Sequence, residues 1–311
     1  MRGIGVIEFG GPEVLQQLDL PETHASAGEV RMRVHASTVN PTDTYLRKGA
    51  RPGVRQDPPP YVPGMDVAGV IDEIGPDTPT SLAIGDAVMA MVVNHASHGG
   101  YRESIVLAAT AVVRIPAGTT LIAAATLPMN GLTARQSLDQ LALKPGQTLA
   151  VTGAAGCYGG YVIQLAKADG LRVIADASAA DAALVRALGA DIVVLRGADV
   201  AAHIRQHAPA GVDGLADGAF QSGLCVAAVR DGGSFASVRG WSGNERGITF
   251  HKTSVRDYNQ RADLLDRLRQ QTEQGIITLR VAASYPAAQA AAAHRRLEAK
   301  GTRGRLVLVW S

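Results

Sequence analysis

The 311-residue sequence has little of what marks several specialised classes of protein. It contains two cysteines, Cys157 and Cys225, which are too few for a disulfide framework or a cysteine-rich zinc lobe. No apolar run approaches the roughly 20 residues of a membrane-spanning helix, and the N-terminus lacks the pattern of a signal peptide. These absences argue against a membrane protein and a disulfide-stabilised secreted domain, and they predict a location in the reducing cytoplasm.

An excess of charge of either sign is also absent. Lysine and arginine number 30 and aspartate and glutamate number 28, so the formal net charge is +2. Such a small charge does not favour nucleic acid as a partner, and RNA binding is therefore a weak alternative. Apolar residues make up 46% and charged residues 19%, which is typical of a soluble globular protein, and the length allows two domains.

Two kinds of pattern divide the chain. Residues 1–125 are rich in short strand-like runs broken by glycine and proline, which predicts a mostly antiparallel, barrel-like domain. Residues 126–253 alternate strands and helices, which predicts a parallel sheet with right-handed crossovers. The expected strands of this sheet are 149–153, 171–175, 191–195, 213–217, 233–238 and 247–250.

The tail of the chain returns to the first pattern. Residues 256–275 have the periodicity of one long charged amphipathic helix, and a strand is expected at 278–282. An alanine-rich helix at 287–299 precedes a last strand at 305–310, which is expected to join the barrel of the first domain. Within that first domain, the loop 51–63 carries three consecutive prolines and is expected to be stiff and exposed.

One segment carries the strongest functional signal. A short apolar strand at 149–153 is followed by glycines spaced three apart, Gly153, Gly156 and Gly159, and then by apolar residues at helical spacing. Such a turn directs a helix N-terminus and bare backbone N–H groups at an anion, and a pyrophosphate fits because only glycine allows so close an approach. The alternative is an ordinary tight turn, but Asp176 at the end of the next strand favours a dinucleotide site.

Several further segments occur in the order found in one enzyme superfamily. They are Val39 to Gly49, Val62 to Val70, Leu127 to Ala134, Lys144 to Gly146, Leu188 to Asp191 and Arg303 to Val309. Together with the glycine motif, they resemble the medium-chain dehydrogenase/reductase superfamily over nearly the whole chain, specifically its zinc-free quinone oxidoreductase-like branch.

The resemblance implies an α/β fold of two domains. Residues 1–125 and 254–311 would form a GroES-like catalytic domain, a partly open β-barrel. Residues 126–253 would form a Rossmann domain, a doubly wound parallel sheet that binds a dinucleotide. The resemblance also implies a homodimer that pairs along the edge strand at 247–250.

The chain differs from the related alcohol dehydrogenases in the residues that stand at the positions of the catalytic metal ligands. Those enzymes bind zinc through a cysteine and a histidine, where this chain has Asn40 and Met65. Neither an amide nor a thioether replaces a thiolate or an imidazole on zinc. His95 and His98 are spaced as a metal-binding pair can be, but no companion ligand is apparent, so neither zinc nor another metal is predicted. Asp66, which follows Met65, is expected to have a structural role.

The resemblance assigns the cofactor to the glycine motif and to segments around it. The residues expected to bind it are Asn130, Thr133, Gly153, Ala154, Ala155, Gly156, Cys157, Tyr158, Gly159, Asp176, Ser178, Arg196, Gly240 and Lys300. Asp176 favours NAD(H), because a carboxylate repels a 2′-phosphate. Ser178, Arg196 and Lys300 favour NADP(H), although the two cations could equally be solvated surface charges. NADP(H) is the predicted cofactor and NAD(H) the alternative, and no flavin motif is present.

The implied chemistry is hydride transfer from the dihydronicotinamide to a quinone or to the β-carbon of an α,β-unsaturated carbonyl. The resulting enolate needs hydrogen-bond donors at its oxygen and a proton for its α-carbon. Asn40 is expected to orient the substrate carbonyl, and Tyr45 is expected to act either as a donor or as a packed wall. Arg51, Met65 and Trp241 are expected to line the substrate pocket.

Two hypotheses of function follow. The first is a metal-free, NADPH-dependent quinone or enoyl reductase, which the alanine- and arginine-rich composition associates with bacterial secondary metabolism. The second is an NADPH-binding structural or scaffold protein without turnover. Such a protein would bind the cofactor but would not oxidise it, whichever acceptor is added.

Overall fold

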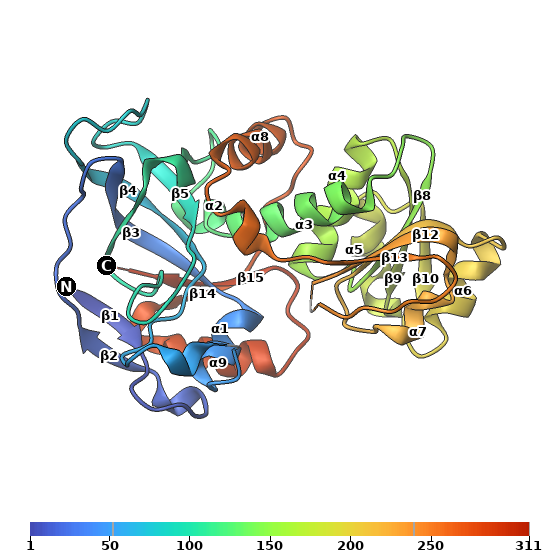
Figure 1. Cartoon of the computed structure of the whole chain (residues 1–311), viewed down its shortest axis with the longest axis horizontal. Coiled ribbons are helices and arrows are strands. Elements are labelled where there is room, and N and C mark those ends of the chain that lie inside the picture. The colour runs from blue at the N-terminus through green and yellow to red at the C-terminus, as the bar shows by residue number, and fades with distance from the viewer. Residues whose placement is uncertain (52, 239, 311) are drawn as a thin grey trace. The chain divides into compact units, whose positions relative to one another are not determined.

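The computed structural model describes residues 1–51, 53–238 and 240–310. The chain forms two compact units, each with its own sheet and hydrophobic core (Figure 1). Unit 1 comprises Met1–Met129, Asn259–Glu273 and Leu279–Ser311, and unit 2 comprises Asn130–Tyr258 and Gln274–Thr278.

Unit 2 is built on a six-stranded parallel sheet. In spatial order its strands are β10 (Ile192–Leu195), β9 (Arg172–Ala177), β8 (Thr148–Thr152), β11 (Val212–Asp217), β12 (Val229–Ser237) and β13 (Thr249–Lys252). This order confirms the predicted parallel α/β sheet, and β13 lies at its edge as expected. The connections reverse direction between β8 and β11, and the carboxyl ends of two such strands are where open α/β sheets bind their ligands.

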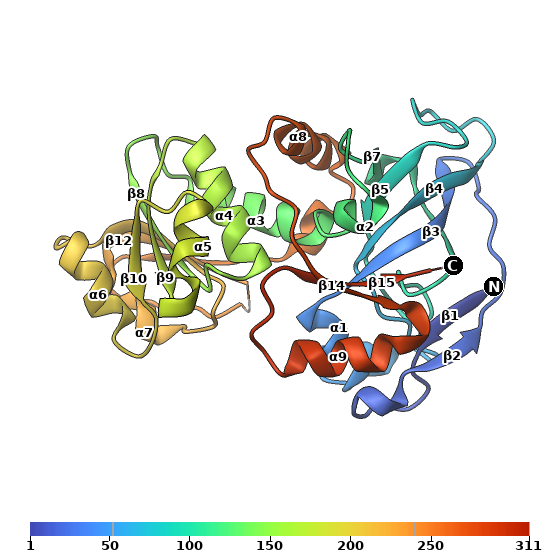
Figure 2. The same cartoon turned by 180° about the vertical axis from the view of Figure 1, so that it is seen from behind.

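Helices cover both faces of this sheet. They are α4 (Cys157–Ala168), α5 (Ala182–Ala187), α6 (Val200–His207) and α7 (Gly223–Val226), and α3 (Pro128–Leu141) precedes β8. Right-handed crossovers to either side of β8 place α4 and α5 on one face and α6 and α7 on the other (Figures 1 and 2). On α4, the apolar residues Val162, Leu165 and Ala166 are buried, as their helical spacing predicts.

Unit 1 contains a seven-stranded, mostly antiparallel sheet. Its path runs through β14 (Val281–Pro286), β15 (Arg305–Val309), β3 (Glu29–Val39), β4 (Asp66–Ile74), β5 (Ala87–Met91) and β7 (Val112–Arg114), and β6 (Ser104–Ala108) pairs with β3. The C-terminal β15 pairs with β3, with Leu306 opposite Val39, so the last strand joins the first domain's sheet as predicted. Register shifts between β3 and β4 mark bulges, which bend the strands of a curled sheet.

A two-stranded sheet and several helices complete unit 1. The strands are β1 (Arg2–Gly5) and β2 (Gln16–Asp19), and the helices are α1 (Pro41–Arg47), α2 (Leu121–Ala124), α8 (Ala262–Glu273) and α9 (Ala290–Glu298). Short 3-10 helices lie at Pro12–Val14, Val54–Gln56, Ala109–Ala111, Ala179–Asp181, Val255–Tyr258 and Ala287–Gln289. Among the described residues, no helix is both long enough and apolar enough to cross a lipid bilayer.

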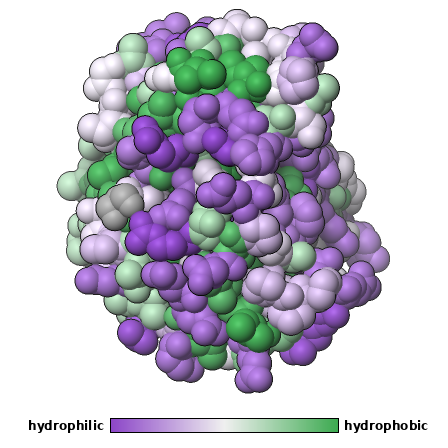
Figure 3. All heavy atoms as spheres, turned by 90° about the vertical axis from the view of Figure 1, so that its left-hand side faces the viewer, coloured by the Kyte–Doolittle hydropathy of each residue, from purple (hydrophilic) through white to green (hydrophobic). Residues whose placement is uncertain are grey.

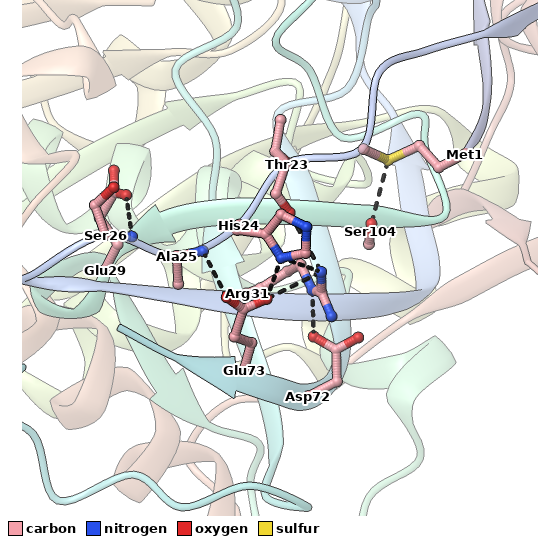
Figure 4. Close-up of polar contacts among 10 residues, drawn as sticks. All are labelled: Met1, Thr23, His24, Ala25, Ser26, Glu29, Arg31, Asp72, Glu73 and Ser104. Atoms are coloured by element: carbon pink, nitrogen blue, oxygen red, sulfur yellow. Dashed lines mark hydrogen bonds and ion pairs between the residues drawn. The ribbon is translucent and has the colours of Figure 1, made fainter. Parts of the chain in front are cut away.

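An ionic cluster around Arg31 fastens the segment ahead of β3 to the sheet (Figure 4). The Arg31 guanidinium donates from Nε to Asp72 Oδ1 at 2.9 Å, and its Nη1 lies 2.9 Å from Glu73 Oε2. Glu73 also accepts the backbone N–H of Ala25 at 3.1 Å and contacts the ring of His24 at 3.1 Å. Hydrophilic side chains like these dominate the face seen in Figure 3, where apolar side chains gather in small groups.

Two predictions for the tail are wrong. Residues 256–275 do not form one helix, because the 3-10 helix Val255–Tyr258 is followed by a non-helical link before α8 begins. The Tyr258 hydroxyl donates to Asp139 on α3 at 3.1 Å and holds the first part in unit 2, whereas α8 buries Leu265 and Leu268 in unit 1. One amphipathic pattern therefore spans two segments that pack separately. The strand expected at 278–282 is β14, which begins later and spans Val281–Pro286.

The loop 51–63 is less exposed than predicted. Pro58 and Pro59 are exposed, but Val54 and Tyr61 are buried in a small cluster with Val6 and Leu46. Pro52 lies outside the described residues. The loop is therefore anchored to unit 1 by its apolar side chains.

The core of unit 2 gives a stability prediction. Phe235 on β12 is fully buried, and its ring lies 5.4 Å from that of Trp241 and 5.6 Å from that of Phe250. Phe235→Ala is expected to lower the free energy of unfolding by about 3–5 kcal/mol, because it leaves a cavity among these rings. Phe220→Ala, at a position 42% exposed, is the matched control and should cost about 1 kcal/mol or less. Urea unfolding followed by circular dichroism measures both, and equal losses would contradict this account.

Candidate functional site

The glycine turn of unit 2 has the close backbone packing that its sequence predicts. Gly153 has a φ of +67°, and a Cβ there would lie 2.8 Å from the carbonyl carbon of Gly218. A Cβ at Gly159 would lie 2.4 Å from the carbonyl oxygen of Gly153. Gly156 is the N-cap of α4, and its N–H donates to the same carbonyl at 2.9 Å. The turn thus presents the N-terminus of α4 at the carboxyl end of β8, where the sheet changes direction.

Asp176 lies against this turn. Its Oδ1 accepts the N–H of Ala154 at 3.2 Å, and its Oδ2 accepts from the Gln221 side chain at 3.3 Å. Burial raises the pKa of Asp176, while the backbone N–H groups and the guanidinium of Arg196 oppose that rise. The sequence predicts a cofactor contact for Asp176, and the structure also makes it a support of the glycine turn. Gln221 was missed, because no local pattern links it to Asp176.

The end of β9 carries charges of both signs. The Ser178 hydroxyl, which is predicted to face a phosphate, donates to Asp181 Oδ2 at 2.6 Å. Arg196 follows β10, and its backbone N–H donates to the carbonyl of Ala177 at 3.0 Å, so its exposed side chain starts beside the end of β9. A 2′-phosphate here would meet the favourable cation of Arg196 and, in addition to the carboxylate of Asp176, the unfavourable carboxylate of Asp181. Asp181 was not predicted from the sequence.

A strained loop follows β11, beside the glycine turn. Phe220 and Ser222 have φ values of +58° and +51°, a left-handed conformation that non-glycine residues rarely adopt. The Asp217 carboxylate holds the loop by accepting the N–H groups of Ala219 at 3.1 Å and Ser222 at 2.8 Å, and the hydroxyl of Thr152 at 2.6 Å. Backbone strain held this firmly is common at ligand sites. The Asp-Gly pair at the end of a predicted strand was the available signal for this loop.

The other residues predicted for the cofactor in unit 2 lie on α3, α4 and the chain after β12. Asn130 and Thr133 are buried in the first turns of α3, and Cys157 is the buried first residue of α4. The Tyr158 hydroxyl donates to Ser137 on α3 at 2.8 Å, which ties the two helices together.

The two remaining unit 2 predictions are adjacent. Gly240 has a φ of +70°, which favours glycine. The Trp241 ring packs against Phe235 and, at 5.3 Å, against Phe250. Trp241 was predicted to line the substrate pocket, and in the structure its ring contributes to the apolar cluster at the edge of the sheet.

In unit 1 the first candidate residue is Asn40. It is the N-cap of α1 and is fully buried. Its side-chain N–H groups donate to Asp66 Oδ2 at 2.7 Å and to Thr38 Oγ1 at 3.1 Å. Met65 is also buried, and its sulfur accepts the hydroxyl of Thr42 at 3.2 Å. The two positions that would carry metal ligands are therefore engaged in hydrogen bonds within the protein.

Two buried carboxylates hold this region together. Asp66 Oδ1 accepts the N–H of Met129 at 2.6 Å, in addition to the contacts of its Oδ2. Asp43 accepts the backbone N–H of Asn40 at 2.8 Å and that of Gly64 at 2.9 Å, and so joins the two segments that carry Asn40 and Met65. Burial raises the pKa of both carboxyls, that of Asp43 to about 7. Sequence reasoning missed Asp43, although an acid three residues after an Asn N-cap was a capping signal.

A chain of buried polar groups continues from Asp43. The Tyr101 hydroxyl lies 3.5 Å from Asp43 Oδ2 and 3.1 Å from His294 Nε2, and His294 Nδ1 lies 3.3 Å from Arg47 Nη1. Burial and the Arg47 cation lower the pKa of His294 to about 3, so the ring is neutral at pH 7. Because Arg47 can only donate, Nδ1 is the acceptor and Nε2 carries the hydrogen that points to Tyr101. Arg47 also pairs with Glu298 at 2.8 Å, so the chain ends at α9.

The remaining predicted residues of unit 1 lie on its loops and helix ends. Tyr45 is half-buried on α1, and the Arg51 guanidinium donates to the Asn94 side-chain oxygen at 2.6 Å. Lys300, predicted for the phosphate, is exposed after α9 and belongs to unit 1. The rings of His95 and His98 are stacked 5.1 Å apart, and among the described residues no group of three or more metal-ligating side chains is found.

Comparisons with known proteins match this architecture. The family described as "Alcohol dehydrogenase GroES-like domain" matches residues 26–117, and the one described as "Zinc-binding dehydrogenase" matches residues 188–308. The quinone oxidoreductase of Mus musculus is 37% identical over 179 residues, which are 57% of this chain and 52% of that protein. The chain thus spans about half the length of that relative.

Solved structures match nearly the whole chain. An NAD-dependent alcohol dehydrogenase has a TM-score of 0.88 and 29% identity, with 99% of each chain covered. A mycobacterial protein complexed with NADPH has a TM-score of 0.85 and 28% identity, with 99% of this chain and 100% of the other covered. The fold is that of a dehydrogenase with a GroES-like domain and a Rossmann-like domain. The chain belongs to the medium-chain dehydrogenase/reductase superfamily, in its quinone oxidoreductase-like branch.

Asp43 predicts how stability depends on pH. Its folded pKa of about 7 lies above the unfolded value of about 3.9. The folded protein therefore holds a proton that the unfolded chain releases, and the stabilisation is complete below the unfolded pKa and lost as pH rises through 7. Between pH 5 and pH 8 the free energy of unfolding should fall by about 2–3 kcal/mol more in the wild type than in Asp43→Asn. Urea unfolding at the two pH values measures this difference.

The exposed Asp77 supplies the control for this measurement. Its positive φ of 51° is tolerated by asparagine, so Asp77→Asn should keep the wild-type pH dependence. An Asp43→Asn variant that keeps that dependence as well would show that Asp43 is not the titrating group.

Proposed function

We propose that this protein is a metal-free, NADP(H)-dependent oxidoreductase that delivers hydride to a quinone or to the C=C bond of an α,β-unsaturated carbonyl. The observation that carries the proposal is the glycine turn at the switch point of the unit 2 sheet. Its backbone packs too closely for any Cβ at Gly153 or Gly159 and leads directly into the N-terminus of α4, so a pyrophosphate could approach the backbone and the positive end of the helix. The sequence similarity to quinone oxidoreductases supports the class of acceptor.

The residues of unit 2 fit such a cofactor. The glycine turn and the N-terminus of α4 that follows it would hold the pyrophosphate. Asp176 would keep the turn in place, and Arg196 would attract a 2′-phosphate. When bound, the dihydronicotinamide supplies the hydride, and the protein contributes orientation and electrostatics.

The donor set in unit 1 argues for chemistry without a metal. Zinc prefers thiolate and imidazole ligands, whereas an amide and a thioether stand at Asn40 and Met65. Both side chains already have protein partners, in Asp66 and Thr42. Activity should therefore be insensitive to chelators.

Asn40 and Tyr45 are proposed to act on the substrate oxygen. The stronger contact of the Asn40 amide is the 2.7 Å bond to Asp66, which fixes the side chain. The 3.1 Å bond to Thr38 is the longer of the two, so a substrate carbonyl would compete with Thr38 for this N–H. The Tyr45 hydroxyl would donate a second hydrogen bond and stabilise the enolate oxygen, and solvent could protonate the α-carbon.

A homodimer is part of the proposal. β13 pairs with β12 on one side, and among the described strands none pairs with its other side. An open edge of this kind is a template for a second copy of the same strand. The state in solution is measured by light scattering of the purified chain.

The proposed reaction is tested by following NADPH oxidation, with chelator present, against a quinone and a cyclic enone of similar size. Turnover of at least one acceptor is expected. Tyr45→Phe should lower kcat by about tenfold to a hundredfold, because a donor to the developing charge is lost. Asn40→Ala should lower kcat/KM further, because it also breaks the contact with Asp66. Tyr285→Phe, at a half-buried tyrosine of β14, is the matched control and should behave as wild type.

Binding and turnover are separated by NADPH fluorescence. If NADPH binds but neither acceptor is reduced, the reductase proposal fails and the protein is a nucleotide binder. If Tyr45→Phe and Tyr285→Phe are equally active, Tyr45 has no role in the chemistry.

The choice of cofactor is tested at the end of β9 and β10. Arg196→Ser should raise the KM for NADPH about tenfold and leave that for NADH unchanged, because a charge-assisted hydrogen bond to the phosphate is lost. Asp181→Ser should have the opposite effect on NADPH, because it removes the carboxylate that Ser178 contacts. Steady-state kinetics with both cofactors measure the ratio. An unchanged ratio in Arg196→Ser would make NAD(H) the better assignment.

A further inference from the structure

Arg102 is a buried arginine that forms no ion pair with any of the residues the structure describes. Its side chain is 4% exposed, and its Nε is enclosed and has no hydrogen-bond partner in the described parts of the chain. Burial lowers the pKa of Arg102, and no acidic group offsets that effect. An isolated charge in such a place is costly unless an ion of opposite charge accompanies it.

Two carboxylates of this region, that of the next residue in the chain and that of an aspartate in contact with Ala96, are engaged elsewhere. Glu103, the next residue, accepts from the Arg2 guanidinium and from the Arg2 backbone N–H at 2.6 Å each. Asp57 accepts the backbone N–H of Ala96 at 3.2 Å. Tyr101, the residue before Arg102, points away into the core against His294.

Beside Arg102 lies a tight hairpin that carries two histidines. His95 and His98 exchange backbone hydrogen bonds at 2.8 and 2.7 Å, and their rings are stacked. Burial, and then the positive charges of Arg102 and His95, lower the pKa of His98 to about 4. His98 is half-buried and His95 is exposed, so the hairpin places one ring toward the interior and the other at the surface.

We propose that Arg102, His98 and His95 form a binding site for a small oxyanion, a phosphate or carboxylate group. The guanidinium offers a planar set of N–H donors that matches such oxygens. The imidazole of His98, whose pKa is lowered to about 4, adds an N–H donor that is neutral at pH 7 and would gain charge when an anion is present. The site lies in unit 1, apart from the glycine turn, and the proposal does not depend on the proposed reductase function.

The proposed anion site is linked through the chain to Arg51, which is predicted to line the substrate pocket. Asn94, whose side-chain and backbone oxygens accept from Arg51 at 2.6 and 3.0 Å, immediately precedes His95. An anion that orders the hairpin would therefore also fix the partner of Arg51. Through this link, a bound anion would influence the position of Arg51.

The test uses inorganic phosphate and acetate as separate probes, at constant ionic strength, with the full chain. Nuclear magnetic resonance of the histidine side chains is the local readout, with the His98 signals identified by their loss in His98→Asn. Phosphate or acetate should shift the His98 signals and raise the pKa of His98, because the anion offsets the charge of Arg102. A response to phosphate alone identifies a phosphate-type ligand, and a response to acetate identifies a carboxylate-type ligand.

Thermal melting gives the second readout. Without added anion, Arg102→Met should melt at a higher temperature than the wild type, because it removes an unpaired buried charge. The anion should raise the melting temperature of the wild type more than that of Arg102→Met, whereas Arg33→Met, an exposed arginine of β3, should respond as the wild type does. The proposal is overturned if neither anion moves the His98 signals, or if both move them equally in the wild type and in Arg102→Met.

Discussion

The arrangement of unit 1 depends on backbone N–H groups held by two buried carboxylates. Asp43 joins the start of α1 to the segment ahead of β4, and Asp66 joins β4 to the start of α3 through Met129. A buried carboxylate gains strongly from such hydrogen bonds, because without them its desolvation would go uncompensated. The residues proposed to meet the substrate are therefore positioned by charges that do not touch it. The positive charge of Arg305 opposes the rise in the pKa of both acids and so favours their charged forms.

This arrangement also bears on the proposed metal-free chemistry, because it shows what holds the two segments of the site together. Where the related alcohol dehydrogenases would have two ligands joined through zinc, this chain joins the same two segments through Asp43. The Asn40 side chain is in turn fixed by Asp66 and Thr38. In the proposed metal-free site, several hydrogen bonds would supply the restraint that a metal supplies elsewhere, each weaker and each dependent on the exclusion of water.

How much the sequence predicts depends on how local each interaction is. The glycine turn, the strands beside it and the last strand of the barrel follow from short patterns, because glycine spacing and apolar periodicity act over a few residues. The role of Asp43 depends on Gly64 and Tyr101, and that of Asp176 on Gln221, and these partners lie far away in the chain. The expected helix at 256–275 fails for the same reason, since its periodicity is real but the two halves pack in different units.

The pairing of β3 with β15 constrains the order in which the protein folds during its synthesis. Residues 36–39 are synthesised long before their partners at 306–309. Arg47 likewise cannot form its contacts with His294 and Glu298 until α9 has been synthesised. Almost all of unit 2 is a single run of chain, so it can acquire its sheet while unit 1 is still incomplete. Closure of unit 1 depends on a contact between distant parts of the chain, so we expect it to be slower than formation of the unit 2 sheet.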